Sequence, residues 1–117
     1  EAMERLANRL KGLGDPTRLR ALALLAGGEL CVCHLMAALE LPQSTVSRHM
    51  AFLRRGGWVE NRRRGKWVYY ALSEPGEGVL AQAMDLLRRE LPRTETARAD
   101  MARLDEQKKN GTACPCE

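Results

Sequence analysis

The chain has 117 residues, 44% of them apolar and 4% aromatic, which suits one compact domain with a helical core and leaves little room for a second. Its longest apolar run, Ala21 to Ala26, is six residues, too short to span a membrane, so we expect a cytoplasmic protein. The net charge is +4, but the block from Arg48 to Lys66 carries +6 and the rest −2. This block indicates a surface for a polyanion or, alternatively, a solvated loop.

Four helices are predicted in the first half of the chain from the spacing of apolar residues. The first spans residues 2–11. The second begins with Asp15 as N-cap and Pro16 in the first position, and it stops at a pair of glycines. The third ends before Pro42, and the fourth runs from there to Arg55.

The apolar period then changes to that of a β-hairpin. Residues 58–62 and 66–72 are predicted strands, joined through a tight turn at Gly65. A fifth helix is predicted over residues 77–91, and a weaker, highly charged one over residues 94–109. We therefore predict a mainly α (α+β) fold, a winged helix-turn-helix with five or six helices and a two-stranded wing.

The fourth helix has two different faces. Val46, Met50 and Leu53 point inward, whereas the opposite face is small, hydroxylated and cationic, which suits the major groove of DNA. The hairpin arginines are placed to reach phosphates beside it. Each element alone also fits an ordinary helix and a solvated hairpin, but their order favours DNA binding. The residues predicted to contact DNA are Gln43, Ser44, Thr45, Ser47, Arg48, His49, Arg55, Arg62, Arg63, Arg64 and Lys66.

For His49, packing between helices is an equal alternative to contact with a base. No nucleophile–base–acid set and no nucleotide-binding loop is present. The chain is therefore not expected to be an enzyme, and a thiol reductase or a metallochaperone is a minor alternative.

Four cysteines form two Cys-x-Cys pairs, Cys31 with Cys33 at the start of the third helix and Cys114 with Cys116 near the end of the chain. Reduced cytosolic thiols favour metal ligation over disulfides. Thiolates select soft ions such as monovalent copper, zinc, cadmium, lead, mercury or trivalent arsenic. The alternatives are small buried side chains for the first pair and incidental thiols on a disordered tail for the second.

Helical geometry imposes a mechanical condition on the first pair. Residues two apart on a helix point about 200° away from each other, so binding one ion through Cys31 and Cys33 should strain or unwind the first turn of their helix. That helix precedes the reading helix, which provides a route from ligand to DNA. His34 is predicted to be a surface histidine and Met36 a core residue.

Four segments occur in an order that is specific to one family. They are Asp-Pro-Thr-Arg at residues 15–18, Glu-Leu-Cys-Val-Cys-His-Leu at 29–35, Ser-Thr-Val-Ser-Arg-His-Met at 44–50 and Gly-Lys-Trp-Val-Tyr-Tyr at 65–70. Together they resemble the arsenic-responsive branch of the ArsR/SmtB family of metalloregulatory transcriptional repressors. The resemblance covers about residues 2–91.

The resemblance implies a homodimer built on the first and fifth helices that binds an operator overlapping a promoter, in the control of arsenical resistance. It also implies release when trivalent arsenic or antimony binds three thiolates, two of which match Cys31 and Cys33. Met36 stands where this branch often has a third cysteine, and we expect Cys114 or Cys116 to complete the site.

Two alternatives keep the same fold. Cadmium, lead or mercury could use the same sulfurs, or the thiols could form a redox sensor. No organic cofactor is implied. The predicted division of the chain is a DNA-binding and dimerisation domain over residues 1–109 and a flexible, Cys-containing tail over residues 110–117.

Overall fold

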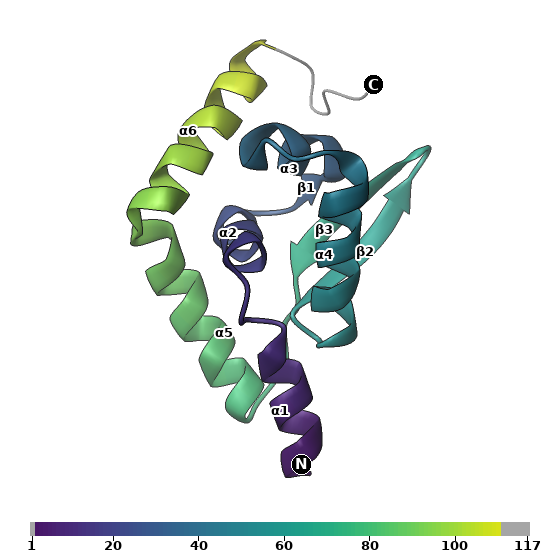
Figure 1. The fold of residues 1–117 in the computed structure, drawn as a ribbon, viewed down its shortest axis with the longest axis vertical. Helices are drawn as coiled ribbons and strands as arrows, with labels where there is room; N and C mark the ends of the chain where they lie inside the picture. The colour runs from purple at the N-terminus through teal and green to yellow at the C-terminus, as the bar shows by residue number, and fades with distance from the viewer. Residues whose placement is uncertain (1, 111–117) are drawn as a thin grey trace.

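Six α-helices and a small antiparallel sheet build residues 2–110, the part of the chain that this computed structural model describes (Figure 1). In chain order the elements are α1 (Met3–Lys11), α2 (Pro16–Leu25), β1 (Leu30–Cys31), α3 (Val32–Leu39), α4 (Gln43–Arg55), β2 (Val59–Arg64), β3 (Trp67–Leu72), α5 (Val79–Glu90), the 3-10 helix η1 (Leu91–Arg93) and α6 (Glu95–Asn110).

Two helices begin at side-chain caps, and the first of these caps is the one that the sequence predicts. Asp15 Oδ2 accepts a hydrogen bond of 3.1 Å from the backbone N–H of Arg18, and Pro16 occupies the first position of α2. Thr94 Oγ1 accepts from the backbone N–H of Ala97 at 3.3 Å, at the start of α6. Local sequence is thus enough to place both helix starts.

The predicted hairpin is present, and its turn contains Gly65 at a φ of 64°, a left-handed conformation that favours glycine. The sheet also contains a third strand that the sequence did not predict. Strand β1 pairs with β3, so the order is β1-β3-β2. Two residues are too few to show an alternating pattern, which explains why β1 was missed.

The interior lies where α2, α3 and α4 meet the sheet. Val46, Met50 and Leu53 are all buried, as the helical pattern of α4 predicts. Leu35 and Trp58 are fully buried beside them. The face of α4 that lies opposite this core is therefore left for contact with another molecule.

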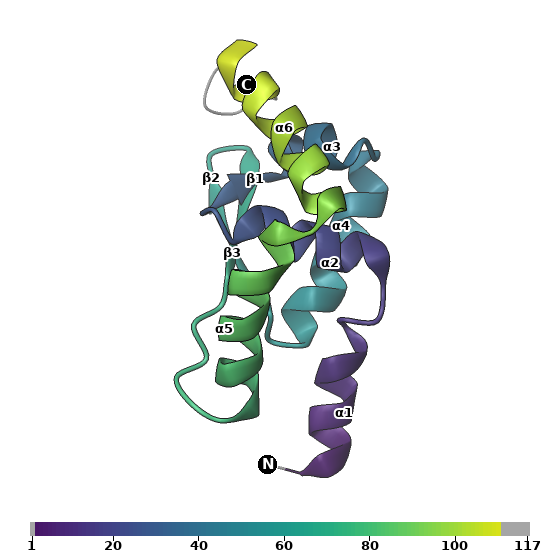
Figure 2. The same ribbon diagram turned by 90° about the vertical axis from the view of Figure 1, so that its left-hand side faces the viewer.

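Helices α5 and α6 follow one another along one side of the molecule (Figures 1 and 2). Helix α6 is fixed to α2 by Asp100, which is fully buried and accepts two hydrogen bonds of 2.9 Å from Arg20. The hydrogen bond to this carboxylate raises the pKa of Arg20 above its ordinary value. Arg103 also donates to Asp100, and its Nε donates to the carbonyl of Ala38 in α3 at 2.8 Å. One buried carboxylate therefore joins three helices.

Within residues 2–110, no helix combines the length and the apolar character that crossing a bilayer requires.

We expect Asp100→Asn to lower the free energy of unfolding by about 3 kcal/mol, because it removes the buried charge that the guanidinium groups of Arg20 and Arg103 share. The value is at the low end for a broken buried ion pair, since the side chains of Arg20 and Arg103 are 25% and 36% exposed. Urea unfolding followed by circular dichroism measures it. The control is Asp105→Asn, an exposed acid on the same helix, and equal midpoints for the two variants would contradict the prediction.

Candidate nucleic-acid interface and thiol site

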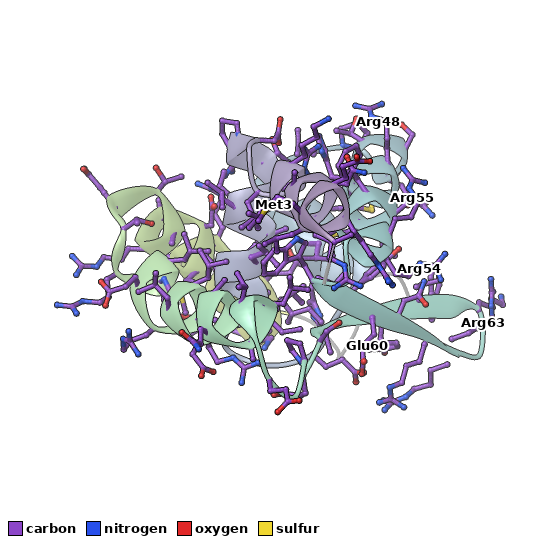
Figure 3. All side chains as sticks on the ribbon, turned by 90° about the horizontal axis from the view of Figure 1, so that it is seen from below. Met3, Arg48, Arg54, Arg55, Glu60 and Arg63 are labelled. Atoms are coloured by element: carbon purple, nitrogen blue, oxygen red, sulfur yellow. The ribbon has the colours of Figure 1, made fainter. Side chains whose placement is uncertain are left out.

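The outward face of α4 is the first candidate surface. Gln43, Ser44, Arg48 and Arg55 are exposed, and Thr45 and Ser47 are half-buried beside them. No side chain caps the first turn of α4, whose N-cap is a proline, so its first N–H groups are available to an acceptor from outside. Figure 3 shows the labelled arginines of α4 on the same side of the molecule as Arg63 of the hairpin.

His49 does not share this outward position. Its Nδ1 lies 3.3 Å from Arg18 Nη1 and 3.8 Å from Asp15 Oδ2, and its side chain is only 16% exposed. The imidazole therefore faces the start of α2, which supports packing rather than contact with a base.

Sequence reasoning missed one exposed aromatic residue on α4. Phe52 is 38% exposed, and the guanidinium carbons of Arg18 and Arg55 lie 4.3 Å and 5.7 Å from its ring centroid. Both distances allow a cation–π interaction. A signal was available, because Phe52 falls outside the inward-facing set of Val46, Met50 and Leu53.

The hairpin arginines differ in their partners. Arg62 Nε and Nη2 donate to the two carboxylate oxygens of Glu29 at 2.6 Å and 2.7 Å, and this pair lowers the pKa of Glu29. The guanidinium carbon of Arg64 lies 4.9 Å from the ring centroid of Tyr69. Arg63 is exposed, and no ion pair holds it among residues 2–110. The wing thus offers one unpaired arginine beside one that a carboxylate already neutralises.

The first cysteine pair spans the junction between strand β1 and helix α3. Cys31 is fully buried in extended backbone, at φ −79° and ψ 162°, and it is the N-cap of the helix. Cys33 is the second residue of α3. The expectation that the pair lies in the first turn of the helix therefore holds for Cys33 and is wrong for Cys31, because pairing with β3 keeps Cys31 extended. Because Cys31 is already extended, the first turn of α3 does not have to unwind at this residue for both cysteines to bind one ion.

His34 is buried, with 4% of its surface exposed, so the predicted surface histidine is also wrong. Its Nδ1 lies 3.3 Å from the Sγ of Cys31. The third residue of a helix can reach back to its N-cap, as in a capping box, and this relation explains the contact. Burial lowers the pKa of His34, and the positive charge of Lys108 lowers it further. Its Nε2 has no hydrogen-bond partner among residues 2–110.

The residues from Ala2 to Asn110 contain no group of three or more His, Cys, Asp or Glu side chains that could hold a metal ion. Cys114 and Cys116, which were predicted to complete the site, lie outside the described residues. Met36 packs against the apolar core, in agreement with its predicted role. The described part of the chain thus contains two of the cysteines predicted as ligands, Cys31 and Cys33, and an imidazole beside Cys31.

The cysteine site and the wing share one row of the sheet. Cys31 in β1 lies opposite Tyr69 in β3, and Tyr69 lies opposite Arg62 in β2. Glu29, which binds Arg62, is two residues before Cys31. The backbone at the buried thiol is therefore connected to the wing through a neighbouring strand and an ion pair.

A helix-turn-helix followed by a β-hairpin, with cations on the outer side of both, defines a winged helix-turn-helix protein. Residues 15–61 match the family model described as bacterial regulatory protein, arsR family. The chain is 37% identical over 82 residues to the arsenical resistance operon repressor of Staphylococcus xylosus. The aligned region covers 70% of this chain and 79% of that protein. The chain belongs to the arsR family, as its sequence motifs predicted.

Two further comparisons agree with this assignment. The chain is 55% identical over 64 residues to the arsenic resistance transcriptional regulator ArsR2 of Pseudomonas putida, covering 54% of this chain and 56% of ArsR2. The chain thus spans a little over half the length of this curated relative. Its fold matches Mb0332 of Mycobacterium bovis, a structure described as a homodimeric winged helix-turn-helix DNA-binding domain, with a TM-score of 0.63, 29% identity and coverage of 80% of this chain and 87% of Mb0332. The named relatives are transcriptional regulators and not enzymes.

Proposed function

We propose that this chain is a metalloid-responsive transcriptional repressor that binds operator DNA as a homodimer and leaves it when trivalent arsenic or antimony binds its cysteine thiolates. The observation that carries the proposal is the position of Cys31, buried in a strand that pairs with the DNA-facing wing. The names of two arsenic resistance regulators among its relatives support the choice of ligand. A repressor acts on the chromosome, so we place it in the cytoplasm.

The proposed DNA interface joins α4 and the wing. Helix α4 enters the major groove with its small and cationic face, where Ser44, Ser47 and Arg48 reach bases or phosphates. Arg63 and Lys66, both exposed, contact the backbone next to that groove. The helix supplies selectivity, and the wing supplies affinity that depends on salt.

The coupling from ligand to DNA follows the sheet. Cys31 is fully buried, so an ion at its sulfur has to displace the side chains packed around it. Displacing β1 shifts its pairing with Tyr69 and the position of Glu29, which holds Arg62. A change of about 1–3 kcal/mol in DNA affinity is the usual size of such coupling.

We assign the third ligand to Cys114 or Cys116. Helix α6 packs against α3, and Lys108 near its end is close enough to His34 for its charge to lower the pKa of that imidazole. Cys114 is four positions after Asn110, and an extended chain of that length spans up to about 14 Å. Cadmium, lead and mercury are alternative ligands for the same sulfurs.

The homodimer is proposed from apolar side chains on α1 and α5. Helix α1 buries none of its residues and projects from the rest of the molecule (Figure 2). Met3 and Leu10 on α1 are 77% and 40% exposed, and Val79 and Leu86 on α5 are 55% and 51% exposed. Pairing of these helices with those of a second copy covers this surface.

We expect Leu86→Glu to convert the dimer to a monomer at micromolar concentration, because it places a charge in an apolar interface. Sedimentation equilibrium measures the change. Ala102→Glu, which adds the same charge to an exposed position of α6, serves as the control and should remain dimeric. A Leu86→Glu protein that stays dimeric would place the interface elsewhere.

The ligand proposal predicts that arsenite releases the wild-type protein from operator DNA and that Cys31→Ser and Cys33→Ser abolish the release. Fluorescence anisotropy of labelled operator measures binding, and circular dichroism checks that each variant is folded. Comparing Cys114→Ser with Cys116→Ser assigns the third ligand.

Unchanged affinity on adding arsenite would remove arsenic as the ligand. Release by cadmium alone would favour a metal-sensing repressor instead. Release by peroxide, with no stoichiometric metalloid binding by mass spectrometry, would favour a redox sensor.

We expect Arg63→Gln to reduce the slope of log affinity against log salt by about 0.9, the amount expected when one phosphate contact is lost. Arg62→Gln should reduce it less, because Glu29 already pairs with that guanidinium. In a Glu29→Gln background the two arginine substitutions should become equivalent. Equal slopes for both single variants in the wild-type background would show that Glu29 does not compete with DNA.

A further inference from the structure

A groove of about 460 Å³ separates α1 from the second half of α4. It lies outside the residues that the sequence assigned to DNA, apart from Arg55. Of the residues between Ala2 and Asn110, those that line it include four cations and no acid: Arg5, Asn8, Arg9, Lys11, Phe52, Arg55 and Gly56. A concave surface of one sign concentrates its electrostatic field and attracts an anion.

The last turn of α1 is held firmly at this groove even though the rest of the helix projects. The indole Nε1 of the fully buried Trp58 donates to the carbonyl of Arg9 at 2.7 Å. Arg18 Nε donates to the carbonyl of Gly12, also at 2.7 Å. A Cβ at Gly56 would lie 3.0 Å from Cδ1 of Trp58, so the end of α4 can approach the indole this closely only with glycine at this position. The backbone that carries the α1 cations is thus preorganised against α4.

The groove is continuous with the proposed reading surface. Phe52 lies between the guanidinium groups of Arg18 and Arg55, and Arg55 lines the groove. Arg48 and Arg55 are seven residues apart, so they share one face of α4, and Figure 3 shows both on the same side of the molecule. A strand of phosphates that passes Arg48 can therefore continue past Arg55 toward α1.

We propose that this groove binds the phosphate backbone of the operator duplex, so that α1 is a third DNA-contacting element besides α4 and the wing. The inference rests on the proposed function. A duplex carries one charge per about 1.7 Å of its axis, which matches a cationic groove better than a second copy of the chain does. The α1 helix of a second copy would bring mostly like charge to this groove, because Glu4 is the single acid within Met3–Lys11.

The test is the salt dependence of DNA binding for Lys11→Gln, Arg55→Gln and the double variant. Each single substitution should flatten the slope of log affinity against log salt by about 0.9, and the double by about twice that amount. Affinity should fall by the same factor for operator and random duplex, because phosphate contacts carry no sequence information. The control is Lys109→Gln, which removes an exposed charge from α6 and should leave the slope unchanged.

Three results would overturn the proposal. In the first, Arg63→Gln flattens the slope while Lys11→Gln behaves like Lys109→Gln, so α1 does not touch DNA although the proposed function stands. In the second, sedimentation shows that Lys11→Gln loses affinity only because it dimerises less well, which assigns the groove to the partner copy. In the third, the wild-type protein binds neither duplex, and the proposed function fails as well.

Discussion

The pairing of strand β1 with β3 is the constraint on which the arrangement of both functional regions depends. It holds Cys31 in extended backbone, so that α3 begins only at Val32. It also brings Glu29 to Arg62, because the two strands flank the same central strand. Without this short strand, the cysteine pair and the wing would be separate parts of the chain. With it, the buried sulfur and the wing belong to one sheet.

Two other buried contacts fix the outer helices to this centre. Asp100 joins α6 to α2 and α3 through Arg20 and Arg103, and it thereby orients the end of the described chain toward the thiol site. Trp58 holds the last turn of α1 against the corner between α4 and β2. Both are single buried polar groups whose hydrogen bonds are satisfied, as burial requires. Helices α1 and α6 are thus each held to the core at one buried contact.

Predictions from sequence succeeded where the cause is local. Asp15 caps α2 because its carboxylate reaches a backbone N–H three residues away, a relation that is visible in the sequence. Val46, Met50 and Leu53 are buried because they recur on one face of a helix. The assignment of His34 to the surface failed because its burial comes from α6, whose contact with α3 no helical pattern near residue 34 reveals. Phe52 was overlooked because its neighbour Arg18 comes from another helix.

The sequence by itself determined the order of the elements, the cationic character of α4 and the hairpin, and the family to which the chain belongs. These properties depend on residue type and on spacing along the chain, which folding does not change. Only the tertiary structure decided that Cys31 is in a strand, that Arg62 is paired with Glu29, and that the α1 cations meet α4 in a groove. Each of these joins segments far apart in the chain, and such contacts are set by the packing of the whole core.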